Sequence, residues 1–317
     1  MGNCIPVTPS VLVNETSLDF TDIMENLSYS EEYLSSLDYA NVKPCHNQYC
    51  LIFQSTAPVF LAIACTLAAL SNGALLVALA KCPHIWSQPH RKALVAQLMV
   101  GTGLFTLLLP SFAAGIQHGW HLGPGLCKLA HVLWHWSLFA QGLLVASSLC
   151  STTWSRWDPL SRRLAVVVWL GALLLATPAA FTSGTVAAPE VVCILRNVEI
   201  LSGVYLAHLI LCLGLFLLLP AALALGSLAM PRLRKGWEPG TCMLWLFFGL
   251  WAPYSVGLAV DFLLQAQLLQ LSCSTFEQFD LMLGLCQALG ILHCCLGPLL
   301  LLAAGLYRHR TGPSSRG

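Results

Sequence analysis

Seven long apolar stretches recur along this 317-residue chain, and each is long enough to cross a bilayer as a helix. Only 9% of the residues are charged and 57% are hydrophobic, whereas about 25% of the residues in an ordinary soluble domain are charged. The predicted spans are residues 57–80, 93–116, 126–151, 164–183, 200–230, 241–266 and 276–307. The sequence therefore predicts an all-α membrane protein, a seven-transmembrane helix bundle.

Basic residues are distributed unequally between the loops of this bundle. Twelve of the fifteen Lys and Arg follow spans one, three, five and seven, while Lys43, Lys128 and Arg196 lie on the other side. Cytoplasmic loops carry the excess of positive charge, so the N-terminus is expected outside and the C-terminus in the cytosol. The expected parts are an extracellular tail over residues 1–56, the bundle over 57–307 and a cytosolic tail over 308–317. Membrane lipid is an expected partner, and nucleic acid is not.

The first 44 residues hold seven of the fourteen acidic residues and a single base, Lys43. This composition favours disorder, which is compatible with binding. An acidic segment suits a basic partner, because long-range attraction raises the encounter rate. Three tyrosines here stand beside acids, a setting that favours sulfation. The ligand contacts predicted in the tail are Tyr29, Glu31, Glu32, Tyr33, Asp38 and Tyr39.

Two further motifs in the tail agree with an extracellular position. Asn14 and Asn26 each begin an Asn-x-Ser/Thr acceptor for glycosylation. Both are predicted to carry a glycan, because the charge distribution places them outside the cell.

Six of the fourteen cysteines fall on the outer side of the predicted bundle, where pairing is expected. Cys127 opens the third span and Cys193 lies in the one sizeable outer loop, so a bond between them would hold that loop over the bundle. Cys45 and Cys50 both precede span one, and Cys273 precedes span seven. A second disulfide from Cys45 or Cys50 to Cys273 would close the helices into a ring. Sequence alone does not choose among the connectivities.

Polar residues near the outer ends of the spans have two interpretations. Asp261 and Asp280 would give the mouth of the bundle a negative rim, or they are ordinary helix caps. His131 and His135 stand four residues apart, as two ligands on one helix face would. No third ligand is evident near them in the sequence, so no metal site and no cofactor are expected.

Several landmarks are typical of one receptor family. They are "SNGALLV" in span one, Trp120 seven residues before Cys127, Pro220 in span five, "FFGLWAPY" in span six and "LHCCLGP" in span seven. In their joint order the chain resembles the rhodopsin-like seven-helix receptors of the chemokine class. Short matches such as "LDYAN", "AQLMVG", "LFAQGLL" and "GLAVDFLL" are similar to the atypical members of that class, which bind chemokines without conventional signalling.

The resemblance implies CC and CXC chemokines, which are basic secreted proteins, as ligands. It implies disulfides Cys127–Cys193 and Cys45–Cys273, although Cys50 could replace Cys45. It implies sulfotyrosine roles for Tyr29 and Tyr39. Gln287 stands where many chemokine receptors carry a Glu that meets the N-terminus of the ligand, which suggests that the deep pocket matters less here than the tail and the rim. Plasma membrane is the expected location, with early or recycling endosomes beside it.

The signalling switches of the family are replaced in this sequence. By resemblance, Thr152 stands where the family has the arginine of Asp-Arg-Tyr, Thr102 where it has an aspartate, and Leu228 where it has a tyrosine. Gly297 and Leu301 stand in place of the Asn and Tyr of Asn-Pro-x-x-Tyr. Polar groups inside a membrane are costly and are kept mainly for function. Coupling to a G protein is therefore not expected. Arrestin binding is not expected either, because only ten residues follow Tyr307.

Two alternatives remain beside a non-signalling chemokine receptor. One is a conventional G-protein-coupled chemokine receptor with divergent switches. The other is an enzyme or transporter, which is not expected because the sequence of the spans shows no carboxylate pair, no serine nucleophile motif and no metal triad. Homo- or hetero-oligomers stay open.

Overall fold

The computed structural model describes residues 49–81, 89–153, 162–187, 191–196, 198–199, 201–229, 239–269 and 272–311. Within these ranges, seven helical segments are long and apolar enough to cross a membrane. They are Ile52–Lys81, Lys92–His118, Gly123–Ser148, Arg163–Thr182, Gly203–Gly226, Cys242–Gln265 and Ser274–Tyr307. The prediction of a seven-transmembrane bundle is therefore confirmed.

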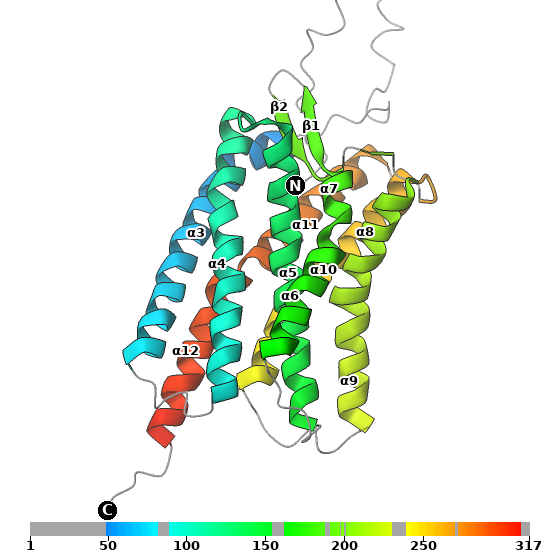
Figure 1. Cartoon of the computed structure of the whole chain (residues 1–317). Helices are drawn as coiled ribbons and strands as arrows, with labels where there is room; N and C mark the ends of the chain where they lie inside the picture. The colour runs from blue at the N-terminus through cyan, green and yellow to red at the C-terminus, as the bar shows by residue number, and fades with distance from the viewer. Residues whose placement is uncertain are drawn as a thin grey trace, which may run out of the picture.

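The spans are continuous helices or helices joined end to end (Figure 1). Spans one to three are α3 (Tyr49–Lys81), α4 (Pro89–His118) and α5 (Gly123–Thr153). Span four is α6 (Arg162–Ala176) with α7 (Pro178–Thr182). Span five is α8 (Gly203–Leu213), η4 (Gly214–Leu218) and α9 (Leu219–Ala229). Span six is α10 (Pro239–Gln265), and span seven is α11 (Cys273–Ile291) with α12 (His293–Thr311).

The third span is the central element of the bundle. In its most apolar stretch 72% of the residues are buried, against 22% in the fourth span. The other spans turn large apolar side chains outward, among them Leu70, Leu107, Leu174 and Ile210. Such a surface is stable only in a medium as apolar as itself, as the lipid of a bilayer is.

Helix starts differ from the predicted boundaries for local reasons. The first helix begins at Tyr49, within the segment predicted as tail, because polar side chains here bond to their own helix. The hydroxyls of Ser55 and Thr56 donate to the carbonyl oxygen of Ile52 at 2.9 and 2.7 Å, so they do not interrupt it. The fifth span begins only at Gly203, because the Ser202 side chain caps it by accepting from the Tyr205 amide.

A widened turn interrupts the fifth span ahead of a proline. The segment η4 is a π-helical turn, and the Leu219 amide donates to the Gly214 carbonyl oxygen, five residues back. Pro220 has no amide hydrogen to donate, so a carbonyl one turn earlier loses its usual partner. Turns of this kind are a common response to such a gap in the hydrogen-bond ladder.

A short hairpin adds a two-stranded sheet to the otherwise all-α fold. Strands β1 (Gly184–Ala187) and β2 (Val191–Ile194) pair antiparallel, with Thr185 opposite Cys193. The hairpin lies across one end of the bundle, which is called the hairpin end below (Figure 1). The C-terminal end of α12 lies at the opposite end (Figure 1).

Candidate functional site

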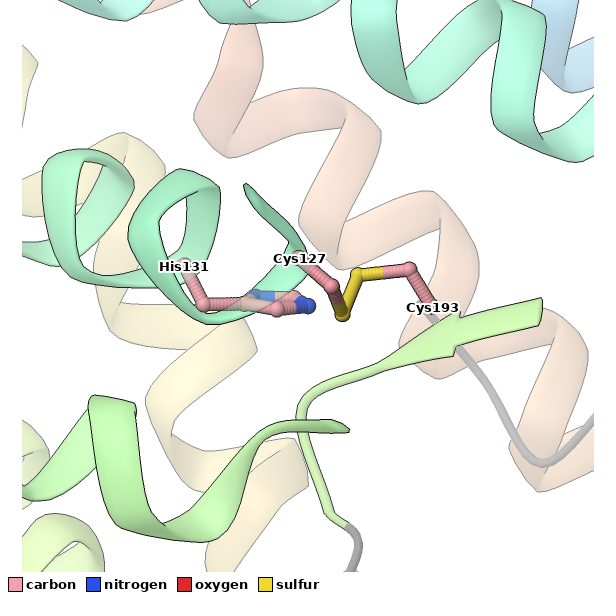
Figure 2. A group of neighbouring side chains, drawn as sticks. All are labelled: Cys127, His131 and Cys193. Carbon is pink, nitrogen blue, oxygen red and sulfur yellow. A yellow bond between two sulfur atoms is a disulfide. The ribbon is translucent and has the colours of Figure 1, made fainter. Parts of the chain in front are cut away.

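The hairpin is bonded covalently to the central helix. A disulfide joins Cys127, near the start of α5, to Cys193 in β2, with the Cα atoms 5.7 Å apart (Figure 2). The Trp120 amide donates to the Val191 carbonyl oxygen at 2.6 Å, and the Trp120 indole donates to Gly123 at 2.9 Å. These contacts fix the hairpin over the mouth of the bundle. One of these contacts is the Cys127–Cys193 disulfide, which is the pairing that the resemblance implies.

Asp261 is held inside the mouth rather than on its rim. Its side chain lies at the end of α10 and is only 6% exposed. Its Oδ2 lies 3.7 Å from Nη1 of Arg196, and its Oδ1 accepts from Gln265 at 2.7 Å. The carboxylate that was predicted to bind ligand therefore already has a cationic partner within the chain. A basic ligand would have to compete with Arg196 for it.

Asp280 is also buried, at 3% exposure, on the face of α11 that meets α3. Its neighbour there is Tyr49, the first residue of α3. Burial, with the Asp280 charge as a second cause, raises the pKa of the Tyr49 hydroxyl above its ordinary value. The Tyr49 ring leaves no room for a side chain at Gly284. Asp280 thus contributes to the contact between the first and seventh spans.

Gln287 lines a small cavity below the hairpin. The cavity measures about 20 Å³, which is room for one or two water molecules and not for the end of a peptide. Its other lining residues are Phe112, His131, Trp134, His135, Leu195 and Tyr254.

The interior beneath this cavity is filled by aromatic rings. Phe105 packs against Trp134 with ring centroids 4.2 Å apart, and against His293 at 4.8 Å. Trp251 lies below them, buried, with its centroid 5.7 Å from that of His293. Aromatic side chains therefore occupy the interior below this cavity.

The positions of the family switches are apolar or neutral where the structure describes them. The Thr102 hydroxyl donates to Asn72 Oδ1 at 2.8 Å, and the Asn72 amide donates to the Ala68 carbonyl oxygen at 2.8 Å. Gly297 packs against Met243, and Leu301 is buried. None of these residues carries a charge. Thr152 and Leu228 lie in α5 and α9, and their side chains are outside the described set.

Other predicted residues also lie outside the part of the chain that the structure describes. They are Asn14, Asn26, Tyr29, Glu31, Glu32, Tyr33, Asp38, Tyr39 and Cys45. Cys273 begins α11, but its side chain is not described either. The tail contacts, the glycans and the second disulfide therefore stay predictions.

Two contacts were not predicted from the sequence. The sequence predicts Arg196 as one of three outer bases. Its position in the sequence does not indicate that Asp261 is its partner. His135 was paired in sequence only with His131, whereas in the structure it lies with His208 and Cys212 from another span. The sequence shows no third metal-ligating group near these histidines, and in the structure the neighbouring groups come from another span; the prediction of no metal site stays a prediction. The four-residue spacing of His208 and Cys212 was a usable signal, but the match with His135 depends on how the helices pack.

Seven spans and a hairpin bonded over one mouth define a multi-pass membrane receptor. No protein family model matches the chain. Atypical chemokine receptor 1 of Homo sapiens is 34% identical over 316 residues, which cover 95% of the chain and 90% of the relative. The proteins of that name from Gorilla gorilla gorilla and Mus musculus are 35% and 28% identical, over 95% and 98% of the chain. The chain belongs to the atypical chemokine receptor 1 family.

Proposed function

We propose that this protein captures CC and CXC chemokines at the hairpin end of the bundle and passes no signal to a G protein. It acts as a plasma-membrane receptor that also visits early or recycling endosomes, and it is not an enzyme. The relatives named atypical chemokine receptor 1 support this assignment. Clearance, transport across cells or buffering of chemokines would follow from its trafficking.

The proposed orientation places the hairpin end outside the cell. Support comes from the unequal distribution of Lys and Arg, with twelve of fifteen following the odd-numbered spans. Lys81 ends α3 and Arg162 begins α6, and both of these helix ends lie opposite the hairpin (Figure 1).

The proposed binding surface is shallow. A cavity of about 20 Å³ does not admit the end of a chemokine, so most contacts would lie on the hairpin and on the acidic tail. The tail supplies negative charge for a basic ligand, and its tyrosine sulfates would add more. Asp261 contributes less than its charge suggests, because Arg196 is already beside it.

The observation that carries the absence of signalling is the neutral network around Thr102. In signalling relatives this level holds charged and polar groups that rearrange when the helices open. Here Thr102 is bonded to Asn72, and the side chains at 297 and 301 are a hydrogen atom and an apolar group. Neither Gly297 nor Leu301 has a polar side-chain group that could change partners on ligand binding.

The test of ligand capture compares Tyr29→Phe/Tyr39→Phe with the wild type in cells, using a panel of labelled chemokines. Loss of two sulfates is expected to weaken binding by about tenfold or more, because each 1.4 kcal/mol corresponds to a factor of ten. The matched control is Tyr307→Phe, an exposed tyrosine near the opposite end. Unchanged chemokine affinity in the double variant would contradict the role of the tail.

A further inference from the structure

Three metal-ligating side chains meet between the third and fifth spans. His135 comes from α5, and His208 and Cys212 come from successive turns of α8. One ligand atom of each lies within 4.8 Å of the other two. The residues are 6%, 2% and 3% exposed, so all three are buried.

The distances between the ligand atoms are close to those in a metal site. His208 Nε2 lies 3.7 Å from Cys212 Sγ. In a tetrahedral zinc site with bonds of about 2.0–2.3 Å, neighbouring ligand atoms stand about 3.5 Å apart. The rings of His135 and His208 meet edge to face, with centroids 4.5 Å apart. Small side-chain rotations would therefore bring all three ligand atoms around one ion.

The hydrogen bond of His135 prepares it as a ligand. Its Nδ1 lies 2.8 Å from the carbonyl oxygen of His131. A carbonyl oxygen only accepts, so Nδ1 carries the hydrogen and the lone pair is on Nε2. Histidines that bind metals commonly use the second ring nitrogen in this way, since it fixes the tautomer and the ring orientation.

His208 provides a second, independent observation. Among the described residues, neither ring nitrogen of His208 bonds outside the cluster: Nε2 contacts Cys212 Sγ, and Nδ1 is buried with no hydrogen-bond partner. A buried polar atom without a partner is rare, because it loses its bonds to water and gains none in return. Cys212 is a free cysteine, so its sulfur is not held in a disulfide, and its hydrogen-bond contact is to His208 within the cluster.

We propose that His135, His208 and Cys212 bind a zinc ion between α5 and α8. Imidazole nitrogen and thiolate sulfur are the donors that zinc prefers, and three protein ligands leave the fourth position to a water molecule. On binding, the Cys212 thiol releases its proton to solvent. The ion would tie the third span to the fifth, and this inference does not depend on the chemokine proposal.

A second group of ligand atoms lies closer to the hairpin but is not a metal site. His131 stands beside Cys127 and Cys193 (Figure 2). The two sulfurs are bonded to each other, and a metal ligand must be a thiolate. Reduction would free both thiols next to His131, so any metal titration has to be done without a reductant.

Cobalt(II) titration of the purified full-length receptor tests the proposal, because Co²⁺ replaces zinc and reports a thiolate ligand by near-ultraviolet charge-transfer absorption. One equivalent is expected to produce this band together with the visible bands of tetrahedral cobalt. One equivalent of Zn²⁺ is expected to remove them and to raise the thermal unfolding midpoint by a few degrees. Absence of the charge-transfer band in the wild type would overturn the proposal.

Variants assign the sulfur ligand. Cys212→Ser is expected to lose the charge-transfer band and the zinc-dependent rise in the midpoint. His208→Gln is expected to weaken cobalt binding at least tenfold. The matched control is Cys286→Ser, which removes a half-buried free thiol of α11 and should behave as the wild type. A band that persists in Cys212→Ser would show that another cysteine binds the ion and would overturn the proposal.

Discussion

Arg196 and Asp261 show how a single contact changes the meaning of a charged residue. Both lie near the mouth, where free charges would act on a basic ligand. Because they lie 3.7 Å apart and Asp261 is buried, their charges largely cancel at a distance. Sequence reasoning could place both residues on the outer side, but their pairing depends on how the loop after β2 folds over α10.

Substituting Arg196 should lower the stability of the protein and raise the association rate of a basic ligand. Arg196→Gln removes the cation beside the buried Asp261 carboxylate, which also accepts a hydrogen bond from Gln265. An uncompensated buried charge is costly, so the thermal unfolding midpoint is expected to fall by a few degrees. Chemokine association should become faster at low ionic strength, and salt should remove the gain.

Lys128→Gln is the matched control, because it removes one positive charge from an exposed position of α5. It should leave the unfolding midpoint unchanged. If the two variants lowered the midpoint equally, the Arg196–Asp261 pair would have no particular role in stability.

At the scale of the elements, the spans could be predicted because a bilayer requires about 20 apolar residues per helix. The ends of the spans could not be predicted, because they depend on local hydrogen bonds. Examples are the Ser202 cap and the bond from the Thr56 hydroxyl to the carbonyl oxygen of Ile52. The hairpin was not predicted either. Its strands are only four residues each, too short for an alternating pattern to be recognised.

Two glycines in the seventh span offer a matched pair of substitutions. A Cβ on Gly290 would lie 2.8 Å from Cε3 of Trp251, a buried ring, whereas one on Gly297 would lie 2.6 Å from the terminal methyl of Met243. The ring of Trp251 is held on several sides, but the methionine chain can rotate away. Alanine also gains about 1 kcal/mol over glycine in a helix.

Overpacking usually costs about 1–3 kcal/mol, and the helix propensity of alanine offsets about 1 kcal/mol of it, so Gly290→Ala is expected to destabilise the bundle by up to about 2 kcal/mol. Gly297→Ala should be close to neutral. Thermal unfolding of the purified variants measures both. Equal losses would mean that Met243 is as constrained as Trp251 and that the region around Gly297 is rigid.

For the whole molecule, the family and the bundle were recognisable from the order of the landmarks along the sequence. The buried site between α5 and α8 was not, because His135 and His208 are 73 positions apart in the printed sequence and meet only when two helices pack. Contacts within one helix follow from spacing, and contacts between helices do not. The Cys127–Cys193 disulfide also joins two separate elements, but the resemblance to the receptor family implied it.

The central claim is that the receptor holds chemokine at its hairpin end while the opposite end has lost the polar groups that would report it. The most direct measurement is ligand-stimulated nucleotide exchange on a purified G protein, with the receptor in nanodiscs and chemokine binding recorded in the same sample. We predict saturable binding with no acceleration of exchange, beside a signalling chemokine receptor that accelerates it. Chemokine-dependent acceleration by this protein would contradict the account.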